Sequence, residues 1–239
     1  MFGDLKEDKT SDVRAMFAAI ADYYDPVNSL LSFRRDGGWR RFAASKAGIR
    51  PGALALDVAT GTGELARHLS RQDGESTVIG IDFCPNMLQK AKAKLVASLG
   101  ESVIELVLGD VLQLPFRDDT FDCVTIGFGL RNVVDMGAAF REIVRVAKSG
   151  SRVVSLELTR PPSLIARALH NFGLFRIVPY VGWLISGNRE AYTYLPDSIK
   201  RFPSPEEVKE IMEEAGLQEV EIYRLTLGVA TVHVAVKEA

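Results

Sequence analysis

The stretch LDVATGTGEL, from Leu56 to Leu65, decides the fold of this chain. An apolar run from Ala53 to Val58 leads into a Gly61-x-Gly63 turn, and a helical pattern begins at Leu65. The pattern predicts a buried strand that turns tightly into a helix, because glycine permits the backbone conformations that such a turn requires. The first turn of that helix offers unpaired N–H groups to a carboxylate or a phosphate, so the turn is suited to ligand binding.

Two cofactors use a turn of this kind. Gly61-x-Gly63-x-x-Ala66 fits the dinucleotide fingerprint, so an NAD-dependent oxidoreductase is one interpretation, although the chain has no Tyr-x-x-x-Lys pair for hydride chemistry. Asp57 favours S-adenosylmethionine instead, because a carboxylate repels a pyrophosphate but attracts an ammonium and a sulfonium. We therefore predict that Asp57, Gly61, Thr62 and Gly63 bind this cofactor.

Further acids end the next two predicted strands. Asp82 closes the apolar run 77–82, where its carboxylate can accept hydrogen bonds from both ribose hydroxyls. Asp110 follows the run 103–108, where it can accept from the adenine amino group while the N–H of Val111 meets a ring nitrogen. A single acid after a strand is often a turn or a cap. A succession of such acids favours a ligand site, because open α/β sheets bind ligands at the carboxyl ends of their strands.

Composition limits the alternatives. The chain has 239 residues, of which 47% are hydrophobic and 25% charged, as is usual for a globular protein. The net charge of −2 provides no general attraction to nucleic acid, so no nucleic-acid partner is expected. Two cysteines are too few for a disulfide framework or a zinc site, which predicts no metal and favours the reducing cytoplasm. The N-terminus lacks the apolar core of a signal peptide.

Apolar runs and amphipathic segments alternate from Ala53 onward, as they do in a parallel sheet covered by helices. The turn signals Pro51-Gly52 and Lys148-Ser149-Gly150 precede the first and fifth strands. We predict one α/β domain over residues 1–239, with a Rossmann-like, doubly wound, seven-stranded sheet, an antiparallel C-terminal hairpin and an N-terminal helical cap over about 11–46. The expected strands are 53–58, 77–82, 103–108, 121–127, 151–157, 218–226 and 229–237, and the expected helices after the first strand are 64–71, 85–98, 137–147 and 205–215.

Several motifs carry a family resemblance. Some are general to methyltransferases, namely GDVLQLPF at Gly109–Phe116 and DDTFD at Asp118–Asp122. Narrower ones are YYD at Tyr23–Asp25, FGLRNV at Phe128–Val133, GWLISG at Gly182–Gly187 and LTLGVATVH at Leu225–His233. In these motifs the chain resembles the ubiquinone/menaquinone biosynthesis C-methyltransferases, which are class I S-adenosylmethionine-dependent enzymes, from about residue 12 to the C-terminus. One departure is Gly127, where the family suggests a serine, so only the backbone of this residue can meet the cofactor.

The resemblance implies methyl transfer from S-adenosylmethionine to a ring carbon of a polyprenylated quinol, such as demethylmenaquinol or a methoxy-benzoquinol. Its lipophilic quinol substrate is the expected partner, and a homodimer is a further expectation. Two other readings stay open. An O- or N-methylating enzyme would keep the cofactor motifs, and a non-catalytic binding module would use the fold alone.

The chemistry requires a way to activate the ring. A phenol has a pKa near 10, so deprotonation at pH 7 costs on the order of 4 kcal/mol. Arg131 is not a base, but a cation directed at the developing phenolate stabilises it, and with Asn132 it can hold a water that removes the proton. We therefore predict that Arg131 and Asn132 are catalytic. The alternative is that Arg131 pairs with an acid and fixes the loop after the fourth strand, and the three histidines are interpreted as surface or packing residues.

An unusually apolar segment follows Pro161-Pro162. It contains no run of the roughly 18 apolar residues that would span a bilayer. We predict a lid over about 160–200 that shelters an isoprenoid tail or contacts the inner face of the cell membrane, although core packing is an alternative.

Overall fold

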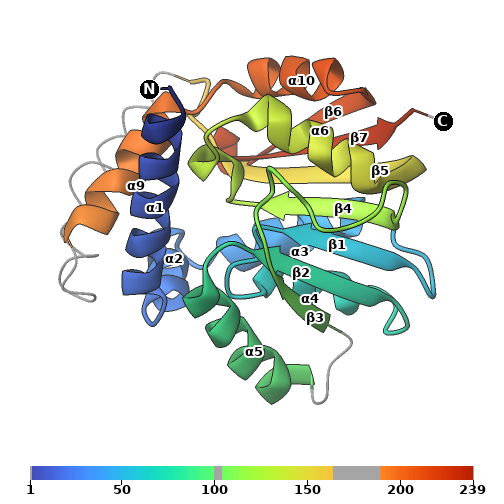
Figure 1. The fold of residues 1–239 in the computed structure, drawn as a ribbon, viewed down its shortest axis with the longest axis horizontal. Helices are drawn as coiled ribbons and strands as arrows, with labels where there is room; N and C mark the ends of the chain where they lie inside the picture. Colours follow the sequence, from blue (N-terminus) through green and yellow to red (C-terminus); the bar gives the residue numbers. More distant parts are fainter. Residues whose placement is uncertain (1, 100–103, 164–188, 239) are drawn as a thin grey trace.

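The computed structural model describes residues 2–99, 104–163 and 189–238 (Figure 1). Within these residues a 7-stranded sheet has the order β3-β2-β1-β4-β5-β7-β6. Strands β1 to β5 run parallel, and β7 is antiparallel to both β5 and β6. This arrangement confirms the predicted α/β sheet with its antiparallel C-terminal hairpin. The strands are β1 Leu54–Val58, β2 Thr77–Asp82, β3 Ile104–Leu108, β4 Phe121–Gly127, β5 Ala147–Leu158, β6 Leu217–Leu225 and β7 Ala230–Lys237.

Helices cover both faces of the sheet, so the central strands are buried on both sides and contain long apolar runs. Residues of α3, α4 and α5 form one hydrophobic core with the sheet, and residues of α6 and α10 form a second core on the opposite face. The bounds of these helices are α3 Asp36–Lys46, α4 Glu64–Ser70, α5 Pro85–Leu99, α6 Met136–Val146 and α10 Pro205–Glu214.

Three further helices gather at the end of the sheet where the parallel strands terminate (Figure 1). They are α1 Phe2–Ile20, α2 Tyr24–Leu31 and α9 Arg189–Arg201. Ile20 and Val27 are buried with Ile199, so the N-terminal helices and α9 share a small core. The helices α1 and α2 lie within or before the range predicted for the cap, about 11–46, and α1 begins nine residues earlier, at Phe2 rather than Ser11. The helix α3, in the same range, packs on a face of the sheet.

One turn prediction is wrong. Lys148-Ser149-Gly150 lies inside β5, which begins at Ala147 rather than at residue 151. The pairing of β4 with β5 shifts between Phe121 and Cys123, and Gly150 has a φ of +72°. A bulge therefore accommodates the residues that resemble a turn, because glycine adopts the left-handed conformation without a steric penalty.

Much of the predicted lid lies outside the described residues, which resume at Arg189 with α9. In the described part of the chain, no helix is long and apolar enough to cross a membrane.

Candidate active site

A pocket that is partly open to solvent lies at the carboxyl ends of the parallel strands. Residues of the N-terminal helices form part of its wall, so the cap covers the end of the sheet. The predicted site residues that line it are Gly61, Asp82, Asp110, Val111, Gly127 and Asn132. The structure therefore brings these residues together, while Asp57, Thr62, Gly63 and Arg131 are not among the lining residues.

Asp82 is the buried carboxylate of this cavity. Its Oδ2 accepts a hydrogen bond from the Gly61 N–H at 2.8 Å, and its Oδ1 accepts from the Cys84 N–H at 2.9 Å. Burial raises the pKa of Asp82, although these backbone hydrogen bonds oppose the rise. Each oxygen can accept more than one hydrogen bond, so the fixed carboxylate can still receive two hydroxyl groups from a ligand.

Asp57 fixes the glycine turn through hydrogen bonds of its side chain. Its Oδ2 accepts from the Thr60 hydroxyl at 2.6 Å and from the Ala66 N–H at 3.2 Å, and its Oδ1 accepts from the Thr125 hydroxyl at 2.7 Å. Burial, the largest influence, raises the pKa of Asp57 to about 6. These contacts join β1, β4 and α4. Asp57 therefore has a structural role that its place in the sequence did not indicate. Direct contact of Asp57 with a cationic ligand stays a prediction.

The glycine turn presents bare backbone to the cavity. Gly61 has a φ of +55°, and a side chain added there would meet no atom within 4 Å. Gly63 caps α4 with a φ of +77°. Both conformations favour glycine, and the space next to Gly61 is available to a ligand.

A charged network ties this turn to the cap. The Thr62 hydroxyl donates to Asp25 of α2 at 2.7 Å, and Lys94 of α5 donates to Asp25 at 2.6 Å. Lys94 also lies 2.9 Å from Glu64. Burial alone would raise the pKa of Glu64, but Lys94 and Arg67 lower it to about 2. The predicted residue Thr62 therefore positions the cap instead of lining the cavity.

Gly127 lines the cavity at the end of β4. A Cβ at this position would approach the Leu65 side chain to 2.9 Å. The leucine at the start of α4 therefore occupies space that a serine at 127 would need. The backbone of Gly127 lies at the cavity wall, and its contact with the cofactor stays a prediction.

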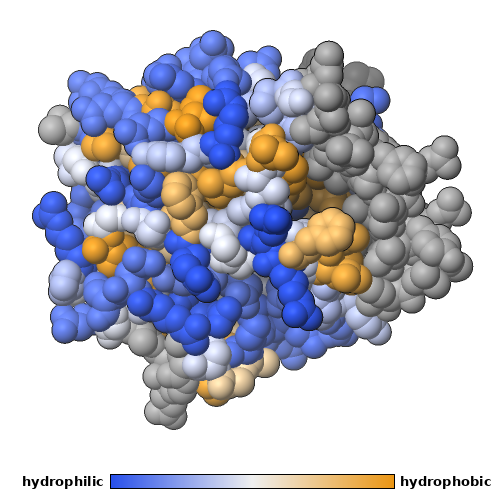
Figure 2. Space-filling model, turned by 180° about the vertical axis from the view of Figure 1, so that it is seen from behind, coloured by the Kyte–Doolittle hydropathy of each residue, from blue (hydrophilic) through white to orange (hydrophobic). Residues whose placement is uncertain are grey.

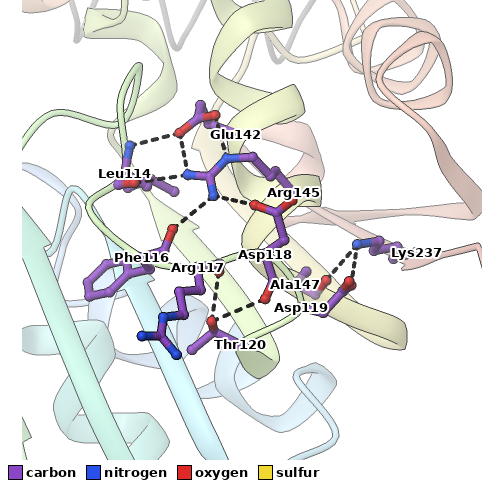
Figure 3. A network of polar contacts seen from close by, with 10 residues as sticks. All are labelled: Leu114, Phe116, Arg117, Asp118, Asp119, Thr120, Glu142, Arg145, Ala147 and Lys237. Carbon is purple, nitrogen blue, oxygen red and sulfur yellow. Dashed lines mark hydrogen bonds and ion pairs between the residues drawn. The ribbon is translucent and has the colours of Figure 1, made fainter.

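Arg145 of α6 holds the loop between β3 and β4 at Leu114, Phe116 and Asp118 (Figure 3). The same loop carries Asp110 and Val111. The Arg145 guanidinium donates to the carbonyls of Leu114 and Phe116 at 2.9 and 2.8 Å and to Asp118 at 2.7 Å. Hydrogen bonds to Glu142 and Asp118 raise the pKa of Arg145. Asp118 of the DDTFD motif therefore helps to hold Arg145 in the position from which it binds the loop. Asp110 itself accepts from the Leu112 N–H at 2.9 Å, which fixes its carboxylate at the cavity.

Arg131 forms a buried ion pair behind the cavity. Its guanidinium lies 2.7 Å from the Glu157 carboxylate at the end of β5, and the two side chains are 7% and 1% exposed. Burial alone would lower the pKa of Arg131, but Glu157 raises it. The acid partner of the alternative interpretation is therefore present, and the action of Arg131 on a substrate stays a prediction. Glu157 was missed, although it ends a buried strand as Asp57 and Asp82 do.

Two tyrosines lie near Asn132, the last residue of the short helix η1, Leu130–Asn132, that follows β4. The Tyr194 hydroxyl of α9 donates to the Asn132 side-chain oxygen at 3.1 Å, and Tyr24 of α2 lines the cavity with Asn132. Burial raises the pKa of both tyrosines, so each hydroxyl holds its proton at neutral pH. The motif YYD contained a signal for Tyr24, but the approach of Tyr194 depends on long-range packing.

No histidine of the described residues lines the cavity. His233 is buried on β7 with its Nε2 2.9 Å from the Pro205 carbonyl oxygen, and burial lowers its pKa. Burial also lowers the pKa of His68 on α4. His170 lies outside the described residues.

A model of the ubiE/COQ5 methyltransferase family matches residues 3–237. This chain belongs to the ubiE/COQ5 methyltransferase family. The family assignment confirms the resemblance found in the motifs and identifies the protein as a methyltransferase. The ubiquinone/menaquinone biosynthesis C-methyltransferase UbiE of Geotalea daltonii is 40% identical over 231 residues, which are 96% of this chain and 98% of the relative. The demethylmenaquinone methyltransferase of Bacillus cytotoxicus is 37% identical over 234 residues and 98% of each chain.

Solved structures share the fold of this family member at lower identity. An S-adenosylmethionine-dependent methyltransferase from Aquifex aeolicus has a TM-score of 0.57 at 20% identity, over 82% of this chain and 88% of that chain. The [4+2]-cyclase SpnF has a TM-score of 0.68 at 15% identity, over 95% of both chains. Because the fold also occurs in a cyclase, the methyltransferase assignment depends on the family match and not on the fold.

Proposed function

We propose that this protein transfers a methyl group from S-adenosylmethionine to a ring carbon of a polyprenylated quinol. The observation that carries the proposal is the relationship, along nearly the whole chain, to enzymes named for C-methylation in ubiquinone and menaquinone biosynthesis. The cavity supports it, because Asp82 and Asp110, two of the acids expected to bind the cofactor, line the same space as Asn132.

The residues of the cavity fit S-adenosylmethionine. Asp82 is fixed by two backbone N–H groups and can accept from the ribose hydroxyls, while Asp110 and Val111 lie where they can contact the adenine. The open space beside Gly61 permits the ligand to approach the backbone closely. When bound, the cofactor supplies a methyl group activated by the positive sulfur. By binding the adenosine part, these residues would orient the methyl donor for transfer.

We place the ring of the quinol beside Tyr24, Phe128 and Asn132, which all line the cavity. The Arg131 guanidinium carbon lies 5.9 Å from the centre of the Phe128 ring, so its charge is close to this lining residue although its side chain is paired with Glu157. A nearby cation lowers the pKa of a phenol and stabilises the phenolate that makes the ring carbon nucleophilic. Asn132, held by Tyr194, is suited to orient the quinol hydroxyl or a water.

The proposal also includes a binding site for the polyprenyl tail and the assembly of the protein into a homodimer. The apolar lid over about 160–200 would shelter the tail, and its residues 164–188 lie outside the described part of the structure. In this proposal the protein contacts the surface of a bilayer and takes the quinol from it. A homodimer is also proposed, to be checked by light scattering.

The decisive experiment incubates the protein with labelled S-adenosylmethionine and a panel of benzoquinols and naphthoquinols, followed by mass spectrometry of the products. We expect a methyl group on a ring carbon of one ring class. Phenol ethers among the products would establish O-methylation, and binding of the cofactor without turnover of any quinol would establish a binding module. Titration with NAD is the control for the cofactor, and selective binding of NAD would contradict the proposal.

A further inference from the structure

Large apolar side chains are exposed on two loops outside the cavity. Leu30 and Phe33, at the end of α2 and after it, are 53% and 86% exposed, and Leu227 on the short helix η3, Thr226–Gly228, is 81% exposed. Burying side chains of this size is worth about 1.5 to 3 kcal/mol each, so leaving them in water is unfavourable. The face seen in Figure 2 carries hydrophobic patches among a mostly hydrophilic surface.

Trp39 of α3 joins the two loops. Its indole N–H donates to the Thr226 hydroxyl at 2.9 Å, and the loop that carries Phe33 leads directly into α3 at Asp36. The segments that carry Phe33 and Leu227 therefore both adjoin the first part of α3. We call Leu30, Phe33 and Leu227 the apolar edge.

Both loops hold their apolar residues in an unfavourable backbone conformation. Phe33 and Arg34 have φ values of +52° and +59°, and Thr226 and Leu227 have φ values of +50° and +58°. The left-handed conformation costs roughly 1 to 2 kcal/mol for each residue other than glycine, with asparagine the best tolerated of the others. A strained backbone that presents exposed apolar side chains is typical of a binding surface.

Positive charge accompanies the apolar edge. Four arginines and one aspartate lie between Phe33 and Phe42, in a chain whose net charge is −2. The aspartate, Asp36, pairs with Arg40 at 2.6 Å, whereas Arg34, Arg35 and Arg41 are exposed. Exposed apolar side chains with arginines beside them match a lipid surface of negative charge, because each basic residue near such a surface contributes about 1 kcal/mol of attraction.

The apolar edge is also connected to the cavity. The ring of Trp39 lies 6.4 Å from the ring of Phe128, which lines the cavity. A surface at this position would bring the site close to a bilayer that holds an apolar substrate.

We infer that the apolar edge and its arginines dock this protein on the surface of an anionic lipid bilayer. The inference assigns membrane contact to described loops outside the predicted lid, and only its biological purpose depends on the proposed function. Phe33 and Leu227 enter the headgroup region, while Arg34 and Arg35 contact the phosphates.

The test is sedimentation with vesicles of phosphatidylcholine, with and without phosphatidylglycerol, in the absence of any quinol. Replacement of Phe33→Asn with Leu227→Asn removes both apolar side chains but suits the left-handed backbone. We expect binding to anionic vesicles to fall roughly tenfold or more, with an unchanged or higher melting temperature. Val96→Asn, which replaces a 51% exposed valine on α5, is the matched control and should bind as the wild type does.

A charge arm completes the test. Arg34→Gln with Arg35→Gln should reduce binding to anionic vesicles by roughly tenfold, and Arg71→Gln with Lys92→Gln, which removes the same charge elsewhere, should not. Equal binding of the Phe33→Asn and Leu227→Asn protein and the wild type would overturn the inference. A change from dimer to monomer in this variant, without any binding of the wild type to vesicles, would assign the surface to a second copy of the chain instead. Because no substrate is used, failure here is separate from failure of the proposed function.

Discussion

The Arg131 guanidinium lies 2.7 Å from the Glu157 carboxylate, and this pair joins the helix after β4 to the end of β5. Glu157 also accepts from the Arg131 backbone N–H at 3.3 Å. Both charges are almost completely buried, so each stabilises the other in a place where neither would be tolerated alone. The pair fixes the segment that carries Asn132 into the cavity.

The first prediction concerns the stability of this pair. Glu157→Leu should destabilise the protein by about 3 to 5 kcal/mol, because it leaves the Arg131 charge buried without a counter-charge. Arg131→Met should cost a similar amount, because it leaves the Glu157 charge unpaired. The double variant Arg131→Met with Glu157→Leu should lose much less than these two single losses combined. Urea unfolding of the wild type and the three variants measures the coupling. Additive losses would show that the two side chains do not depend on each other.

The second prediction separates structure from chemistry at Arg131. In the folded double variant, turnover should fall by roughly 100-fold while the affinity for S-adenosylmethionine stays nearly the same, as expected when one preorganised charge is removed. Arg131→Lys should recover little, because a lysine lacks the planar fork that meets Glu157. Steady-state kinetics and calorimetry provide the two readouts. Full turnover in the folded double variant would restrict Arg131 to anchoring the loop.

The third prediction concerns the ribose. Asp82→Asn keeps the shape of the side chain but removes its charge, so the affinity for S-adenosylmethionine should fall by roughly 10- to 100-fold. Titration calorimetry checks this, with circular dichroism as the control for folding. An unchanged affinity would remove Asp82 from the cofactor site.

The fourth prediction is a dependence of stability on pH. Burial raises the pKa of Asp57 from 3.8 to about 6, so the folded protein binds this proton more tightly than the unfolded chain. The stabilising effect is complete below about pH 4 and is lost as the pH rises through 6. About 2 pKa units correspond to roughly 3 kcal/mol. The free energy of unfolding of the wild type, relative to Asp57→Asn, should therefore fall by up to that amount between pH 4 and 7. A flat difference in urea unfolding would contradict it.

The fifth prediction uses two glycines with the same conformational strain. Gly61 and Gly74 have φ values of +55° and +76°, and a side chain at either would meet no atom within 4 Å. Gly61→Ala and Gly74→Ala should each cost about 1 kcal/mol of stability. Only Gly61→Ala should also reduce the affinity for S-adenosylmethionine, because only Gly61 lines the cavity. Equal affinities would show that the ligand does not approach Gly61.

The sequence by itself determined the order of the strands, the positions of the helices α4, α5, α6 and α10, and the edge of the sheet where the site lies. Local patterns were sufficient because a buried parallel strand requires a run of apolar residues, and the glycine turn requires its own residue types. The acids Asp82 and Asp110 were found because they directly follow such runs. The turn signal at residues 148–150 misled, because a bulge and a turn use the same kinds of residue.

Only the tertiary structure decided which side chains meet. Asp57 comes just before the glycine turn in the sequence. Its carboxylate nevertheless accepts hydrogen bonds from Thr60, Ala66 and Thr125 and does not line the cavity. Arg131 finds Glu157 from 26 residues away, and Asn132 finds Tyr194 from 62 residues away. Such partners depend on the packing of separate elements, and the sequence contains no periodic signal for a contact between them. Burial then determines whether a carboxyl group is ionised, because its pKa depends on its contact with water and on its hydrogen-bond and charge partners in the folded protein.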